Sequence, residues 1–116
     1  MSKIIIGKLN AICVFSAWSF FAITIGYLVY LYFFGNYEGA IVTLAYIFGA
    51  FALFTLAHLV LAFFVRCPSC NKCITVQGIN KPHPKSRGGW SGVIWRWLSG
   101  SVVCIHCGSQ VNTNAL

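Results

Sequence analysis

The sequence predicts a membrane α protein in which two apolar helices form a hairpin and a short polar tail follows them. Residues 9–37 and residues 39–65 contain no Asp, Glu, Lys or Arg, and the rest of the chain carries two Cys-x-x-Cys pairs. Only 8% of the residues are charged and 59% are hydrophobic, whereas ordinary soluble domains have about 25% charged residues. A soluble fold of this composition would expose large apolar patches.

Each uncharged block is long enough to cross a bilayer. A helix needs about 20 apolar residues to span the hydrocarbon core, so we expect transmembrane helices at Asn10–Phe34 and Ala40–Val65, preceded by residues 1–9 and joined by an external turn at 35–39. A buried hairpin in a soluble protein is disfavoured, because no other segment is apolar enough to cover it. The first block also exceeds the apolar region of a signal peptide, about 7–15 residues, and we interpret it as a retained anchor.

The basic residues predict the orientation of this hairpin. Lys3 and Lys8 precede the first block and six Lys and Arg residues follow the second, while the turn holds only Glu38. Positively charged flanks stay on the cytoplasmic side, so we expect both termini in the cytoplasm, with residues 66–116 forming a cytoplasmic tail. The net charge of +7 then lies close to anionic lipid, and a bacterial inner membrane fits this bias.

Small and polar side chains within the blocks suggest how the helices associate. Small residues recur at spacings of three and four, which lets helices approach closely in lipid; they are Ser19, Ala22 and Gly26 in the first block and Ala45, Gly49 and Ala52 in the second. They predict either a packed hairpin or contact with a partner helix. His58 is the intramembrane polar candidate. We interpret it first as a neutral histidine bonded to a carbonyl or another helix, and second as part of a proton or ion path.

The tail begins and ends with paired cysteines. Cys67 and Cys70 follow the second block directly, and Cys104 and Cys107 lie close to the C-terminus. A two-residue gap lets both thiolates of a pair face one ion, and zinc favours four such ligands in a tetrahedron. One structural Zn²⁺ is therefore the expected cofactor, and it would hold together a tail too short to build a large core.

These pairs resemble the knuckles of the zinc-ribbon superfamily, which usually read CPxCG or CxxCG. Cys104–Gly108 matches that pattern, whereas Asn71 follows the first pair where Gly is usual. Asn is the next best residue for a left-handed turn. The resemblance covers about residues 66–112 without the insert between the knuckles. It implies a small fold of short β-hairpins around one metal ion, and it does not imply an activity.

Three other uses of the cysteines stay open. A rubredoxin-like iron site has the same paired knuckles, although rubredoxins are typically acidic and this tail has no acidic residue. The reducing cytoplasm disfavours a dithiol redox pair, and the missing continuation after Cys73 disfavours an iron–sulfur cluster. Cys73, His83 and His106 are candidates to replace one of the four ligands.

A basic, tryptophan-rich insert lies between the knuckles, near residues 78–98. Residues 78–89 have the composition of a loop, and short strands are expected at 74–76 and 101–103. Tryptophan and cationic side chains favour the membrane interface. We therefore expect an interfacial helix or a docking patch built from Arg87, Trp90, Trp95, Arg96 and Trp97, with a small tryptophan core as the alternative. Nucleic-acid binding is disfavoured, because no RNA-binding motif is present.

The sequence favours a non-enzymatic function. The blocks and the tail contain no acidic residue, and no nucleophile–base or general acid–base arrangement is apparent. A four-cysteine zinc site is closed and structural. We expect an accessory subunit or adaptor that docks on a larger membrane complex. The alternatives are a homo-oligomeric channel or membrane-perturbing effector with the ribbon as gate or sensor, and a membrane-anchored redox protein.

Overall fold

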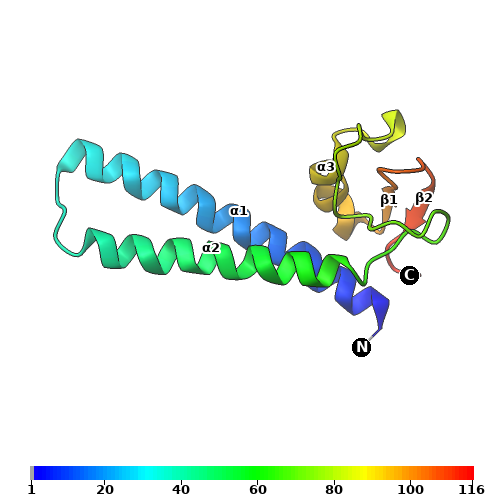
Figure 1. Cartoon of the computed structure of the whole chain (residues 1–116), viewed down its shortest axis with the longest axis horizontal. Coiled ribbons are helices and arrows are strands. Elements are labelled where there is room, and N and C mark those ends of the chain that lie inside the picture. The colour runs from blue at the N-terminus through cyan, green and yellow to red at the C-terminus, as the bar shows by residue number, and fades with distance from the viewer. Residues whose placement is uncertain (1) are drawn as a thin grey trace.

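The computed structural model describes residues 2–116 and shows a long helical hairpin with a small fold packed at its open end (Figure 1). The hairpin consists of α1 (Lys3–Phe34) and α2 (Ala40–Ala62). The tail contains η1 (Pro84–Ser86), α3 (Gly89–Arg96), η2 (Trp97–Ser99), β1 (Ser101–Val103) and β2 (Gln110–Asn112). Strands β1 and β2 pair antiparallel, with Val102 opposite Val111.

Local signals set the ends of the two long helices. The Ser2 hydroxyl accepts a hydrogen bond from the Ile5 N–H at 3.4 Å, so α1 begins seven residues before the expected span. Gly35 ends α1 in a left-handed conformation, in which its N–H donates to the Leu31 carbonyl at 2.9 Å. Gly39 has a φ of 67° and lets the chain turn into α2. The turn between the helices therefore depends on two glycines, which adopt positive φ without steric cost.

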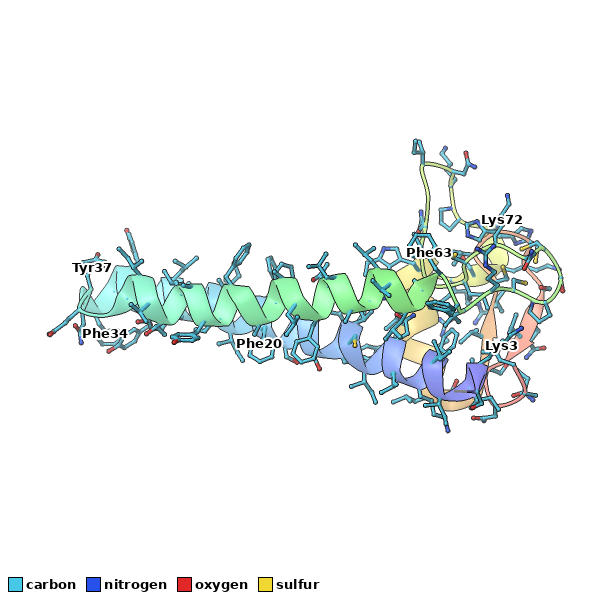
Figure 2. The ribbon with its side chains drawn as sticks, turned by 60° about the horizontal axis from the view of Figure 1, so that its bottom comes forward. Lys3, Phe20, Phe34, Tyr37, Phe63 and Lys72 are labelled. Atoms are coloured by element: carbon cyan, nitrogen blue, oxygen red, sulfur yellow. The ribbon has the colours of Figure 1, made fainter. Side chains whose placement is uncertain are left out.

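Both helices are long and apolar enough to cross a membrane. At 1.5 Å per residue, the 32 residues of α1 extend about 48 Å and the 23 residues of α2 about 35 Å. Most of their large apolar side chains are exposed, for example Tyr32 at 81% and Ile41 at 83%. Figure 2 shows Lys3 and Lys72 at the end that carries the tail, and Phe34 and Tyr37 at the opposite end. A helix in the core of a soluble protein would bury this surface.

The small-residue stripes do not form the contact between α1 and α2. Aromatic pairs join the helices instead, with 5.7 Å between the ring centroids of Phe20 and Phe54 and 5.7 Å between those of Phe21 and Phe51. A Cβ atom added at Gly26 or Gly49 would meet nothing within 4 Å. Of the two expectations for these stripes, contact within the hairpin is not met at Gly26 and Gly49, and contact with a partner helix stays a prediction.

The first half of α1 forms part of the core of the tail. Its buried residues recur every three or four positions and are Gly7, Asn10, Ala11, Val14 and Ala17. Ala11 packs into the same cluster as Ile74, Trp97, Val102 and Ile105 of the tail. The tail is therefore folded onto the helical hairpin, and α1 supplies a wall that so few residues of the tail could not supply alone.

The expected strand at 74–76 is not formed. Arg66 and Cys73 make an isolated antiparallel bridge, and the chain turns at Ile74 and Thr75. Both of these consecutive residues are fully buried, at 0% and 1% exposure. In a strand, successive side chains point to opposite faces, so a strand at the edge of this small fold could not bury both. The expected strand at 101–103 is confirmed as β1.

Candidate metal centre and its surroundings

The four paired cysteines meet at one point. The Sγ atoms of Cys67, Cys70, Cys104 and Cys107 all lie within 4.8 Å of one another. The Sγ atoms of Cys67 and Cys107 are 3.7 Å apart, and those of Cys70 and Cys104 are 3.8 Å apart. A zinc–sulfur bond of about 2.3 Å gives a tetrahedron with edges of about 3.8 Å, whereas a disulfide needs about 2.0 Å. The cluster therefore has the dimensions of a metal site.

The two knuckles have the same backbone structure. In the first, the Cys67 carbonyl accepts from the Asn71 N–H at 2.9 Å, and the Cys67 N–H donates to the Lys72 carbonyl at 2.9 Å. In the second, the corresponding bonds of Cys104 join it to Gly108 at 3.0 Å and to Ser109 at 2.8 Å. Asn71 and Gly108 both take positive φ, 56° and 72°. The asparagine therefore fills the left-handed position that glycine usually fills.

The surroundings give the four thiols unequal acidity. Burial raises the pKa of Cys104 to about 12 and also raises the pKa of Cys70. Burial also acts to raise the pKa of Cys67, but hydrogen bonds from the Cys70 backbone and the Ser109 hydroxyl outweigh it and lower this pKa to about 6. The Ser109 hydroxyl, 3.0 Å from the Cys107 Sγ, lowers the pKa of Cys107. Only a cation at the centre would keep all four sulfurs as thiolates.

The three candidate replacement ligands, Cys73, His83 and His106, lie outside the cluster. The His106 Nε2 donates to the Cys73 carbonyl at 2.9 Å and so ties the second knuckle to the segment after the first. The His83 Nδ1 accepts from the Lys85 N–H at 3.2 Å, and the His83 ring lies against Gly108. The described residues that meet at the cluster are the four paired cysteines, and Cys73 is not among them.

The predicted tryptophan and arginine patch separates into two parts. Trp97 is 1% exposed and packs against Gly7 of α1, so it belongs to the core and not to the surface. Trp90 is half-buried, whereas Trp95 is 71% exposed beside the exposed Arg96. Of the predicted patch residues, Trp97 therefore lies in the core, while Trp95 and Arg96 lie on the surface, and their docking role stays a prediction.

A buried polar bridge that the sequence analysis missed joins the tail to both helices. The Asn10 Nδ2 donates to the Thr75 Oγ1 at 2.9 Å, and the Asn10 Oδ1 lies 2.8 Å from the His58 Nδ1. Since the amide oxygen can only accept, His58 donates from Nδ1. Asn10 is 0% exposed. Asn10 lies in a stripe of small residues on one face of α1, and this stripe is the sequence feature that could have predicted its burial.

Comparison with known proteins adds no identity to this geometry. No protein-family model, no curated protein and no solved structure matches the chain.

Proposed function

We propose that this chain is a non-enzymatic, membrane-anchored adaptor whose tail is held in shape by one structural zinc ion. The observation that carries the proposal is the meeting of four Sγ atoms within 4.8 Å, in a tail that packs against the end of an apolar helical hairpin. Four thiolates fill the tetrahedral shell of zinc and leave no open position for a substrate. The metal therefore contributes folding free energy and not catalysis.

Zinc is favoured over iron by the composition around the site. The tail has no acidic residue, unlike the typically acidic rubredoxins that the paired knuckles also resemble. The raised pKa values of the half-buried Cys70 and the buried Cys104 favour their thiol forms unless a cation is bound. A divalent cation of high thiolate affinity suits this centre, and zinc fills it in a structural role because it has no redox chemistry.

The anchoring follows from the exposed apolar surface of α1 and α2. We place both helices across the bilayer, the turn around Glu38 outside, and the tail with both termini on the cytoplasmic side, because the Lys and Arg residues gather at that end. The tail then stands directly on the membrane surface. An exposed ridge of Trp95 and Leu98, 71% and 64% exposed, flanks Arg96 and is the surface offered to a partner subunit.

Metal analysis with matched cysteine variants tests the proposal. The full-length protein in detergent should contain one zinc per chain by mass spectrometry. Cys67→Ser should lose the zinc, and proteases should then cut the tail, whereas Cys73→Ser should keep both the zinc and the resistance, since Cys73 lies outside the cluster. Bound iron would instead support the redox alternative, and zinc loss in both variants would show that the ligand set is wrong.

A second experiment tests the adaptor role itself. A photo-crosslinking amino acid at position 95 should give one discrete product of higher mass in cell membranes, because Trp95 is exposed on the ridge. The same group at Asn80, on the basic loop of the tail, is the control and should give none. A product of twice the chain's mass would favour the homo-oligomeric alternative, and no product at position 95 would count against a docking surface there.

A further inference from the structure

Two cavities lie where α3 rests against the helical hairpin, and Trp18 lines both of them. The first has a volume of about 300 Å³ and runs between α1 and α2, with Phe21, Phe51 and Thr55 among its walls and Trp90 closing it from the tail. The second has a volume of about 280 Å³ and is lined by Trp95, Arg96 and the small residues of α3. One aromatic side chain thus separates an apolar cavity from a cationic one.

We propose that these two cavities form one binding site for a phospholipid, with an acyl chain in the first and the phosphate in the second. The inference shares with the proposed function the placement of α1 and α2 in the bilayer, and its second cavity borders the ridge through Trp95 and Arg96. It needs neither the zinc ion nor a protein partner.

The first cavity has the shape and lining that a hydrocarbon chain requires. It follows α1 from Val14 to Phe21, a rise of about 10 Å at 1.5 Å per residue, and it leads away from the tail toward the turn. The Thr55 hydroxyl in its wall already donates to the Phe51 carbonyl at 2.8 Å. The Nδ1 of His58 is held by Asn10. The wall therefore presents mainly carbon to its contents.

The second cavity carries groups that recognise a phosphate. The exposed guanidinium of Arg96 offers a fork of N–H donors, which pairs with phosphate oxygens in two-bond geometry. Ser91 lines the same space, but its hydroxyl already donates to the Gly88 carbonyl at 2.9 Å, so Arg96 is the phosphate partner. The tail has no acidic residue, and the chain's one carboxylate side chain, Glu38, lies in the turn at the far end of the helical hairpin. The local potential therefore favours an anionic group over an ammonium group.

A cluster of packed aromatic rings lies between the two cavities. The Trp18 ring lies 5.9 Å from that of Trp90 and 5.6 Å from that of Phe15, and Phe15 contacts Trp95 at 5.8 Å. Tryptophan prefers the boundary between hydrocarbon and headgroups. This cluster therefore places the second cavity among the headgroups and the first cavity in the hydrocarbon, which is the arrangement of a bilayer lipid.

Native mass spectrometry of the full chain in detergent, titrated with dioleoyl phosphatidylglycerol, tests the site. One lipid adduct should form at low lipid concentration. Thr55→Phe, which fills the first cavity, and Arg96→Gln, which removes the phosphate partner, should each weaken this adduct by about tenfold or more. The matched controls are Thr43→Phe, at an exposed threonine near the turn, and Lys81→Gln, at an exposed cation outside the second cavity; both should bind as the parent does.

Three results would overturn the proposal. Equal adducts in all variants would mean that the basic tail attracts lipid without a site. Diolein, which lacks the phosphate, should bind at least about tenfold more weakly than phosphatidylglycerol, and equal binding would refute the headgroup cavity. Should Thr55→Phe fail to fold, Phe21→Trp fills the same cavity from α1, and unchanged binding there would refute the chain cavity. Zinc content, measured in parallel, shows separately whether the metal centre is intact.

Discussion

Replacing Asn10 by alanine is the sharpest test of how the tail is held on the helical hairpin. The asparagine is fully buried and bonds Thr75 of the tail at 2.9 Å and His58 of α2 at 2.8 Å. Asn10→Ala removes both bonds and leaves a hydroxyl and an imidazole N–H without their partner. We expect the tail to open more often, while the cysteine cluster itself, built without Asn10, keeps its metal ligands.

The size of the effect follows from the two bonds. A net hydrogen bond contributes about 0.5–1.5 kcal/mol, and a buried group left unpaired costs about 1–3 kcal/mol. Partial relaxation of His58, which is only half-buried, keeps the total for Asn10→Ala near 2–4 kcal/mol. Thr75→Val keeps the shape but strands one N–H of the asparagine, and should cost about 1–2 kcal/mol. Asn10→Ala combined with Thr75→Val should cost less than the sum of the two single changes, because neither change then leaves the other's side chain without its partner.

Hydrogen exchange at the Ile74 amide measures this opening directly. That N–H donates to the Val65 carbonyl at 3.2 Å, and Ile74 is adjacent to Thr75, the partner of Asn10. The protection of this N–H from exchange reports the free energy of local opening. If Asn10→Ala lowers the free energy of local opening by about 2–4 kcal/mol, exchange of this amide becomes about 30-fold to 1,000-fold faster. Asn80→Ala, at an exposed asparagine of the tail, is the control. The reasoning is refuted if Asn10→Ala changes exchange no more than Asn80→Ala does, or if the single and double changes are simply additive.

Three further predictions concern the docking of the tail at Gly7, the turn residues of the two knuckles, and the pH dependence of zinc binding. Gly7→Ala should destabilise the docked tail by about 1–3 kcal/mol in thermal unfolding, because the new Cβ would lie 2.7 Å from a buried indole, whereas Gly26→Ala has open space and should not. Asn71→Gly should leave zinc affinity unchanged, while Gly108→Ala, at a φ of 72° against an imidazole ring, should weaken it in a chelator competition. Since two thiols with raised pKa must lose their protons to bind zinc, affinity should fall roughly 100-fold for each pH unit lowered between 8 and 6 in the same competition.

The sequence was sufficient to predict the helical hairpin and the cysteine cluster. The helical hairpin follows from composition, because each uncharged block is long enough to span a bilayer. The cysteine cluster follows from local backbone geometry, because a two-residue gap lets both thiolates of a pair face one ion. The presence of Asn71 where the knuckle pattern usually has glycine could also be interpreted correctly, because few residue types adopt a left-handed backbone conformation. These features need no knowledge of which segments touch.

The contacts between distant segments could not be predicted in the same way. Asn10 looked like the edge of a span, because its partner Thr75 lies 65 positions away. Trp97 and Trp95 are two residues apart and of the same type, and helical residues at this spacing point to different sides. Which of the two sides is buried depends on the packing of the tail against α1, which buries Trp97 and leaves Trp95 exposed. The neighbour of Gly26 and Gly49 could not be predicted either, because small residues at helical spacing do not say which helix they face.

The bond between Asn10 and Thr75 also sets an order of events during synthesis. At about 5–20 residues per second, several seconds pass between the emergence of the asparagine and that of its partner, 65 positions later. An unpaired amide in hydrocarbon costs several kcal/mol, so the nascent α1 is expected to keep its first turns in the wet interfacial layer during this interval. If α1 spans a membrane as proposed, it is expected to reach its final depth only after Thr75, made 65 positions after Asn10, can pair with it.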